Sequence, residues 1–289
     1  MSIQLLALDL DGTLLNSRGE ISASNRRAIA MARARGVRVA LVTGRRFRDA
    51  RPVALELGLD VPVIAHNGAL TKHARTLETV AAWLLPLEAA REVLSVGRAH
   101  RADPLVSDDP AGPGLLLYDH LSDDNVPLQK YIAWARRIAG GEADVFVRRV
   151  PSLEAYLDHP PVHISFSGDC AAMDRLSGDL AASLGQRVQV MSTIYPRLDF
   201  TLLDILHPAA SKGAGLAAVA SEYGVAREDV MAIGDNFNDL EMLRYAGTSV
   251  VMGNADSRLR EMDGFHVTTS NDESGVAAAI ERFILDVSG

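Results

Sequence analysis

The chain has few of the features that mark secreted, disulfide-rich or membrane proteins. Its 289 residues include one cysteine, Cys170, which excludes an internal disulfide and a cysteine-rich metal site and fits a reducing cytoplasm. No run approaches the roughly 18 apolar residues that a membrane span needs. No basic segment precedes an apolar stretch at the N-terminus, as a secretion signal would require. We therefore expect a cytoplasmic protein without a membrane partner.

The chain has fewer basic residues, 29 Lys and Arg, than acidic residues, 37 Asp and Glu. The formal net charge is −8, and no block of basic residues occurs, so a nucleic-acid partner is disfavoured. A hydrophobic content of 48% and a charged content of 23% are usual for a globular protein with a sizeable core. An acidic protein of this kind must bind an anion with a few local donors or with a metal ion.

The order of the predicted elements indicates an α/β fold. At both ends of the chain, apolar runs of strand length alternate with helical periodicity, which is typical of a doubly wound parallel sheet. The predicted strands there are residues 3–9, 37–42, 61–65, 229–233 and 248–252. The predicted helices are residues 22–35, 47–57, 213–223, 239–245 and 275–285.

The middle of the chain follows a different pattern. Helical periodicity is predicted for residues 88–96, 128–139 and 171–184, and strands for residues 114–118, 145–149, 162–167, 188–191 and 198–203. Loops rich in proline, glycine and aspartate separate them, and Asp108 with Asp109 is expected in such a solvated loop. We interpret residues 84–206 as an inserted α+β domain, and residues 1–83 plus 207–289 as the main domain.

Two aspartates, Asp9 and Asp11, follow the first predicted strand and precede Gly12 and Thr13. The carboxyl end of a buried strand is the edge where ligands of open α/β sheets bind. Burying charge is costly unless the charge is paired or bound to a metal ion. A divalent cation, which prefers oxygen ligands, is therefore the expected reason for two acids at this place.

Three further motifs fall at predicted strand ends or helix starts. Residues 41–45 read Leu-Val-Thr-Gly-Arg, residues 211–213 read Ser-Lys-Gly, and residues 234–239 read Gly-Asp-Asn-Phe-Asn-Asp. Each motif alone fits a turn, a helix cap, a solvated lysine or a polar loop. Together they supply acids for a metal, a cation for phosphate oxygens and neutral donors, which are the parts of phosphoryl transfer. No Ser-His or Cys-His pairing is evident, so the nucleophile is a carboxylate or water.

These motifs resemble those of the haloacid dehalogenase-like (HAD) phosphohydrolases, and the insert resembles their type-2 cap. Residues 41–45, 67–69, 211–213 and 271–277 are similar to the Cof-type branch of that superfamily. The resemblance implies a Rossmann-like core with an inserted cap domain. It also implies a phosphatase that uses Mg²⁺ and hydrolyses a small phosphomonoester, such as a sugar phosphate.

The resemblance further implies a role for each motif residue. Asp9 would be the nucleophile that forms an aspartyl-phosphate, and Asp11 would protonate the leaving group and then activate water. Asp9, the backbone carbonyl of Asp11 and Asp235 would bind Mg²⁺. The residues implied to bind phosphate are Leu10, Thr43, Gly44, Lys212 and Asn238. Asp239 would have a supporting role, orienting either Lys212 or metal-bound water, and Arg45 and Asn67 are candidate substrate contacts.

Two other functions stay open from the sequence. A phosphotransferase or phosphomutase would pass the aspartyl-phosphate to an acceptor other than water. A non-enzymatic, phosphate-binding regulatory module would need neither acid, although both Asp9 and Asp11 are present. The sequence leaves the substrate open and is compatible with a monomer or a small homo-oligomer.

Overall fold

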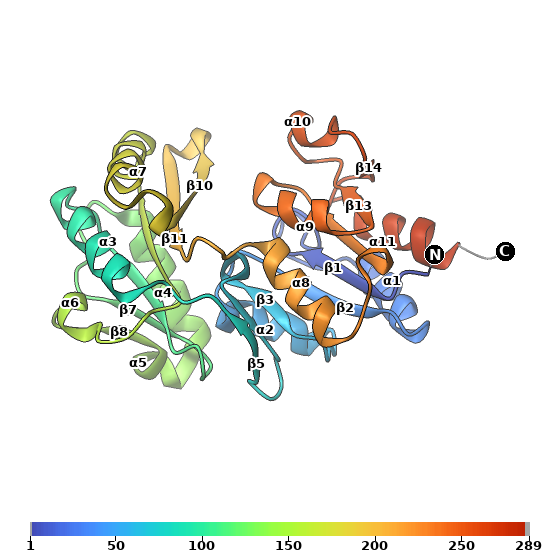
Figure 1. Cartoon of the computed structure of the whole chain (residues 1–289), viewed down its shortest axis with the longest axis horizontal. Coiled ribbons are helices and arrows are strands. Elements are labelled where there is room, and N and C mark those ends of the chain that lie inside the picture. Colours follow the sequence, from blue (N-terminus) through green and yellow to red (C-terminus); the bar gives the residue numbers. More distant parts are fainter. Residues whose placement is uncertain (1, 287–289) are drawn as a thin grey trace. The chain divides into compact units, whose positions relative to one another are not determined.

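The computed structural model describes residues 2–286, and the chain forms two compact units (Figure 1). The first unit, called the core below, comprises Met1–Ala81 and Ser211–Gly289. The second unit, called the insert, comprises Ala82–Ala210, and the expected inserted domain, 84–206, falls inside it.

An eight-stranded sheet forms the centre of the core, in the order β14-β13-β12-β1-β2-β3-β4-β5. Neighbouring strands from β14 to β3 pair in parallel, and β3 pairs with β4 in the antiparallel sense. This arrangement confirms the predicted α/β fold. The strands are β1 Leu5–Asp9, β2 Arg38–Val42, β3 Val63–Ala65, β4 Leu70–Lys72, β5 Thr79–Ala82, β12 Val230–Gly234, β13 Thr248–Val251 and β14 His266–Val267.

Helices cover the core sheet and connect its parallel strands. They are α1 Ala23–Ala34, α2 Phe47–Glu56, α8 Lys212–Glu222, α9 Leu240–Tyr245, α10 Ser257–Arg260 and α11 Gly275–Ile280, and a π-helical turn, Glu281–Leu285, continues α11. Side chains N-cap three of them. The Ser22 and Ser211 hydroxyls accept amide hydrogens from the first turns of α1 and α8, and the Asp256 carboxylate accepts one from the first turn of α10.

The alternation of side chains along β1 positions the first acid. Leu5 and Ala7 pack in one apolar cluster with side chains of α8 and α9. Asp9 follows in the same alternation, so its side chain leaves the sheet on the face that α8 covers. Leu6 and Leu8 point to the other face and are fully buried as well. The strand thus delivers Asp9 toward the start of α8.

The insert contains a six-stranded sheet in the order β10-β11-β9-β6-β7-β8. Its neighbouring strands are antiparallel except β7 and β8, which are parallel. Side chains of α3 and α7 pack in one cluster with β6, β9 and β11, and those of α4 in another with β6, β7 and β8. The elements are α3 Leu87–Ala99, β6 Leu105–Asp108, β7 Leu115–Tyr118, α4 Val126–Ala139, α5 Ala143–Phe146, β8 Val147–Arg149, α6 Leu153–Tyr156, β9 His163–Gly168, α7 Cys170–Leu184, β10 Gln189–Tyr195 and β11 Phe200–Leu206.

Some local predictions are wrong. Strands β4, β5, β6 and β14, which have two to four residues each, were not predicted. Val145 lies in the short helix α5 rather than in a strand. Asp108 is buried at the end of β6, where its carboxylate contacts His159 Nε2 at 2.9 Å and the Tyr156 hydroxyl at 3.3 Å, so it is not a solvated loop residue.

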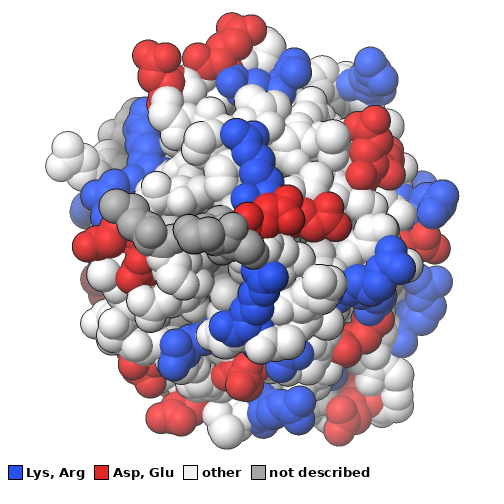
Figure 2. All heavy atoms as spheres, turned by 90° about the vertical axis from the view of Figure 1, so that its right-hand side faces the viewer, with Lys and Arg blue, Asp and Glu red and all other residues white. Residues whose placement is uncertain are grey.

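Charged side chains of both signs are intermixed on the face of the molecule shown in Figure 2, in keeping with a formal net charge of −8 spread along the chain. Within residues 2–286, no helix combines the length and the apolar composition needed to cross a bilayer.

Candidate functional site

The first motif turns sharply after β1 and is fixed against the fourth motif. Gly12 has φ +84°, a conformation that favours glycine, and a Cβ at this position would overlap the Asp235 carboxylate. The next residue, Thr13, donates its hydroxyl to Asp235 Oδ1 at 2.7 Å. The turn therefore brings the end of β1 and the end of β12 into direct contact.

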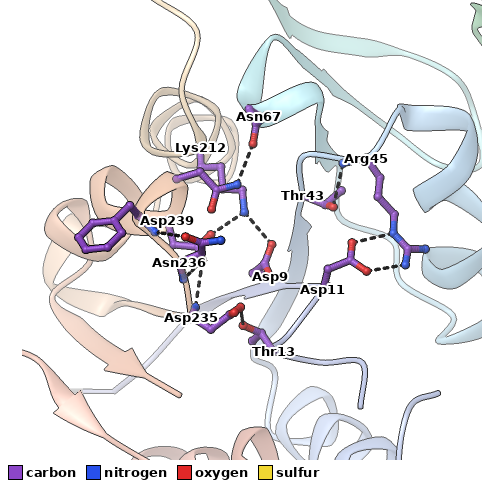
Figure 3. A network of polar contacts seen from close by, with 12 residues as sticks. Asp9, Asp11, Thr13, Thr43, Arg45, Asn67, Lys212, Asp235, Asn236 and Asp239 are labelled. Carbon is purple, nitrogen blue, oxygen red and sulfur yellow. Dashed lines mark hydrogen bonds and ion pairs between the residues drawn. The ribbon is translucent and has the colours of Figure 1, made fainter. Parts of the chain in front are cut away.

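A buried lysine joins two of the aspartates. Lys212 is the first residue of α8, and its Nζ donates to Asp9 Oδ1 at 2.6 Å and to Asp239 Oδ1 at 2.5 Å. All three side chains are at most 6% exposed. Figure 3 shows Asp9 and Asp239 both pointing toward this ammonium. The structure thus brings the first motif and the third motif into contact.

Negative charge exceeds positive charge in this cluster. Burial raises the pKa of Asp9 well above its usual value, although Lys212 acts in the opposite direction. Burial likewise raises the pKa of Asp235 to about 6. For Lys212, burial lowers the pKa, but the charges of Asp239 and Asp9 outweigh it and raise the pKa above its ordinary value. The cluster is therefore electrostatically suited to a further cation.

Asp239 holds the loop of the fourth motif. Its Oδ2 accepts the amide hydrogens of Asp235 and Asn236, each at 3.0 Å, while its Oδ1 accepts from Lys212. A Cβ at Gly234 would overlap the Asp239 side chain, which explains the glycine at the end of β12. This residue therefore links the loop of the fourth motif to Lys212.

The acids that could hold a metal ion are Asp9, Asp235 and Asp239, whose ligand oxygens lie within 4.8 Å of one another. The metal ligands expected from the sequence are instead Asp9, Asp11 and Asp235, with Asp11 contributing its backbone carbonyl. Both oxygens of Asp239 already accept hydrogen bonds, so Asp9 and Asp235 are the better side-chain ligands. Carboxylate oxygens of this kind are the ligands that Mg²⁺ prefers.

Neutral donors of the second and fourth motifs gather beside the acids. Asn238 Nδ2 donates to Asn67 Oδ1 at 3.1 Å, and the Asn67 side chain lies against Gly44. The Asn67 amide donates to the carbonyl of Thr43 at 3.0 Å. The structure thus brings together Thr43, Gly44, Asn67 and Asn238, although they come from three separate segments of the chain.

Two predicted site residues take positions that the sequence did not indicate. Arg45 contacts Asp11 through two hydrogen bonds, from Nε to Oδ2 at 2.8 Å and from Nη2 to Oδ1 at 2.6 Å. Leu10 is fully buried and its carbonyl accepts the Leu15 amide at 2.9 Å, so any phosphate contact would come from its main chain.

Sequence reasoning missed the asparagines that fix the loop after the first motif. Asn254 donates from Nδ2 to the carbonyl of Gly12 at 2.9 Å, and its Oδ1 accepts the Asn271 amide at 2.9 Å. Asn271 in turn donates from Nδ2 to the carbonyl of Leu15 at 2.9 Å. The Cof-like signature at residues 271–277 was the available signal for Asn271, whereas nothing in the sequence distinguishes Asn254.

Comparison with known proteins adds to this geometry. The family model of the haloacid dehalogenase-like hydrolases matches residues 6–280. The chain is 30% identical over 309 residues to 5-amino-6-(5-phospho-D-ribitylamino)uracil phosphatase YwtE of Bacillus subtilis (strain 168), covering 98% of each protein. It is 29% identical over 265 residues to pyridoxal phosphate phosphatase YbhA of Escherichia coli (strain K12), covering 90% of this chain and 91% of that protein. A solved haloacid dehalogenase-like hydrolase from Bacteroides thetaiotaomicron aligns with a TM-score of 0.81 at 27% identity, covering 97% of this chain and 99% of that one.

Proposed function

Since the chain belongs to the haloacid dehalogenase-like hydrolases and is a phosphatase of phosphomonoesters, we propose that it works through an aspartyl-phosphate on Asp9 and uses Mg²⁺. The match to the family model confirms the membership that the motifs indicated. The observation that carries the proposal is the buried Asp9–Lys212–Asp239 network, with Asp235 beside it, at the end of β1. A non-enzymatic module is disfavoured by the phosphatases among the relatives.

In the first half of the reaction, a carboxylate oxygen of Asp9 attacks phosphorus and the bond from phosphorus to the leaving oxygen breaks. Lys212 holds the attacking carboxylate in place and offers its positive charge to the phosphoryl oxygens. The leaving oxygen takes a proton from Asp11 and departs as an alcohol. Asp9 then carries the phosphoryl group.

In the second half, a water molecule attacks the same phosphorus and gives its proton to Asp11. The bond between phosphorus and the Asp9 oxygen breaks, which frees inorganic phosphate and regenerates the carboxylate. Throughout, the Thr43 hydroxyl, the Gly44 amide and the Asn238 side chain supply neutral donors for the phosphoryl oxygens. They offset charge in the transition state without adding another cation.

Asp9, Asp235 and the Asp11 carbonyl would hold Mg²⁺. The carboxylates of Asp9, Asp235 and Asp239 have ligand oxygens within 4.8 Å of one another. Their excess of negative charge fits a hard divalent cation. When bound, Mg²⁺ would neutralise phosphate charge and help to orient the group for in-line attack.

We infer that the substrate is a small phosphorylated metabolite, such as a sugar phosphate. The relatives named above are phosphatases of a ribitylaminouracil phosphate and of pyridoxal phosphate, both small phosphomonoesters. Substrate choice would come from the insert, because the four motifs assigned to phosphoryl transfer all lie in the core.

A panel of phosphorylated metabolites, assayed for phosphate release with Mg²⁺, tests the substrate class. The Asp9→Asn variant should lose at least about 10³-fold in kcat for p-nitrophenyl phosphate. The matched control is Asp174→Asn, which alters an exposed carboxylate on α7. Near wild-type turnover by Asp9→Asn would rule out Asp9 as nucleophile. Phosphate release that falls short of substrate consumed would favour transfer to another acceptor.

A further inference from the structure

The ion pair between Arg45 and Asp11 is not explained by phosphate binding. Its two hydrogen bonds, at 2.8 and 2.6 Å, engage both oxygens of the Asp11 carboxylate in the planar fork that arginine favours. Figure 3 shows the Asp11 side chain directed toward Arg45, whereas Asp9 is directed toward Lys212. The two acids of the first motif therefore have different cationic partners.

The backbone around Arg45 is itself fixed by the site. Its amide donates to Thr43 Oγ1 at 3.1 Å, and its carbonyl accepts the His66 amide at 2.9 Å. The guanidinium thus extends from the second motif, whose backbone these hydrogen bonds hold in place. A cation anchored in this way can hold the direction of the Asp11 carboxylate, which extends from the short loop after β1.

The contact contributes orientation rather than stability. The Arg45 side chain is 31% exposed and that of Asp11 is 59% exposed. Ion pairs so accessible to water stabilise a fold by only about 0.2–1 kcal/mol. A carboxylate has about four acceptor positions, so the two hydrogen bonds from Arg45 leave room on Asp11 for the leaving oxygen and then for water.

We propose that Arg45 is a positioning residue that orients Asp11 for its two proton transfers. This inference rests on the proposed function, because orientation of Asp11 matters only where that residue moves protons. It differs from the expectation that Arg45 contacts the substrate, because two of the guanidinium donors already engage Asp11. A misplacement of about 1 Å in a reacting group can cost as much as 10²-fold in rate.

Kinetics of Arg45→Met and Arg45→Lys, with p-nitrophenyl phosphate and glycerol phosphate, test the inference. For Arg45→Met we expect kcat to fall by about 10- to 100-fold while KM changes by less than about twofold. Arg45→Lys should recover only part of kcat, because an ammonium cannot form the two-pronged contact. The control is Arg18→Met, which removes the exposed Arg18–Glu20 ion pair and should leave kcat unchanged.

A double-mutant cycle with Asp11→Ala separates the possible routes of action. If Arg45 acts through Asp11, Arg45→Met should lower kcat no further in the Asp11→Ala background. If the losses in kcat caused by Arg45→Met and by Asp11→Ala multiply in the double variant, Arg45 acts independently of Asp11 and the inference is overturned. A raised KM with unchanged kcat would likewise overturn it, because it would mean that Arg45 contacts the substrate directly. Wild-type kcat in Asp11→Ala alone would instead refute the proposed proton transfers. Circular dichroism checks that each variant folds. If Arg45→Met does not fold, Arg45→Lys takes its place in the double-mutant cycle.

Discussion

Replacement of the buried Lys212 should destabilise the core strongly. In Lys212→Met the ammonium is lost, while Asp9 and Asp239, which lie 2.6 and 2.5 Å from it, stay buried without their cation. Breaking a buried pair by removing one partner costs about 3–5 kcal/mol. For a unit of this size each kcal/mol lowers Tm by about 2–4 °C, so we expect a fall of about 6–20 °C.

The assay is thermal unfolding of the full chain with a chelator present, because a bound divalent cation would stabilise the native state. Circular dichroism follows both units, whereas fluorescence of Trp83 and Trp134 follows the insert, which contains both tryptophans. The shift should therefore be large by circular dichroism and small by fluorescence. Lys130→Met, which alters an exposed lysine on α4, is the matched control.

A second substitution tests the physical cause of the loss. Adding Asp239→Asn to Lys212→Met removes one of the stranded charges, so the double variant should be more stable than the sum of the two single effects by about 1 kcal/mol or more. A loss below about 1 kcal/mol in Lys212→Met, or simple additivity in the double variant, would refute the view that Lys212 neutralises buried acids.

The remaining predictions concern other parts of the molecule. Gly68→Ala should destabilise the core by about 2–4 kcal/mol in urea unfolding, because φ is +94° and a Cβ would overlap a backbone carbonyl. Asn254→Ala should lower kcat while changing Tm only slightly, because the substitution frees the loop beside the acids. An unchanged kcat would contradict this. Hydrogen bonds that the His159 ring donates to Asp158 and Asp108 raise the pKa of His159. This contribution to the stability of the insert is therefore full below about pH 6.5 and is lost as pH rises through the raised pKa. Tryptophan fluorescence in urea at several pH values should show that loss in the wild type and not in the His159→Gln variant. Chelation of divalent cations should abolish phosphate release and added Mg²⁺ should restore it; activity that persists in chelator would remove the metal ion from the mechanism.

The sequence predicts the centre of the site well because its parts follow from sheet geometry. Parallel strands end at one edge of a sheet, so Asp9 at the end of β1 and Asp235 after β12 were expected to lie close together there, and they do. The start of α8 after an N-capping serine placed Lys212 at the same edge. Apolar runs and helical periodicity gave the longer elements within a few residues of their observed bounds.

Other features depend on packing that periodicity does not encode. The contact of Arg45 with Asp11 requires the relative directions of two loops, which the spacing of the motifs does not give. Asp108 looks like a solvated residue in a loop-rich segment, but His159 and Tyr156 reach it from a distant part of the insert. The partners of a polar side chain are decided by the fold, so a polar local sequence does not identify a buried position.

The pairing of β1 with β12 joins the two ends of the chain, so the proposed active site can be assembled only late in synthesis. Asp9 meets Lys212 and Asp239 only after the ribosome has made more than 200 further residues, and the loop after β1 waits for Asn271 as well. The insert is continuous from Ala82 to Ala210, so all of its strands are available earlier. Since domains generally fold as units during synthesis, the nascent chain carries a complete insert before it has an active site.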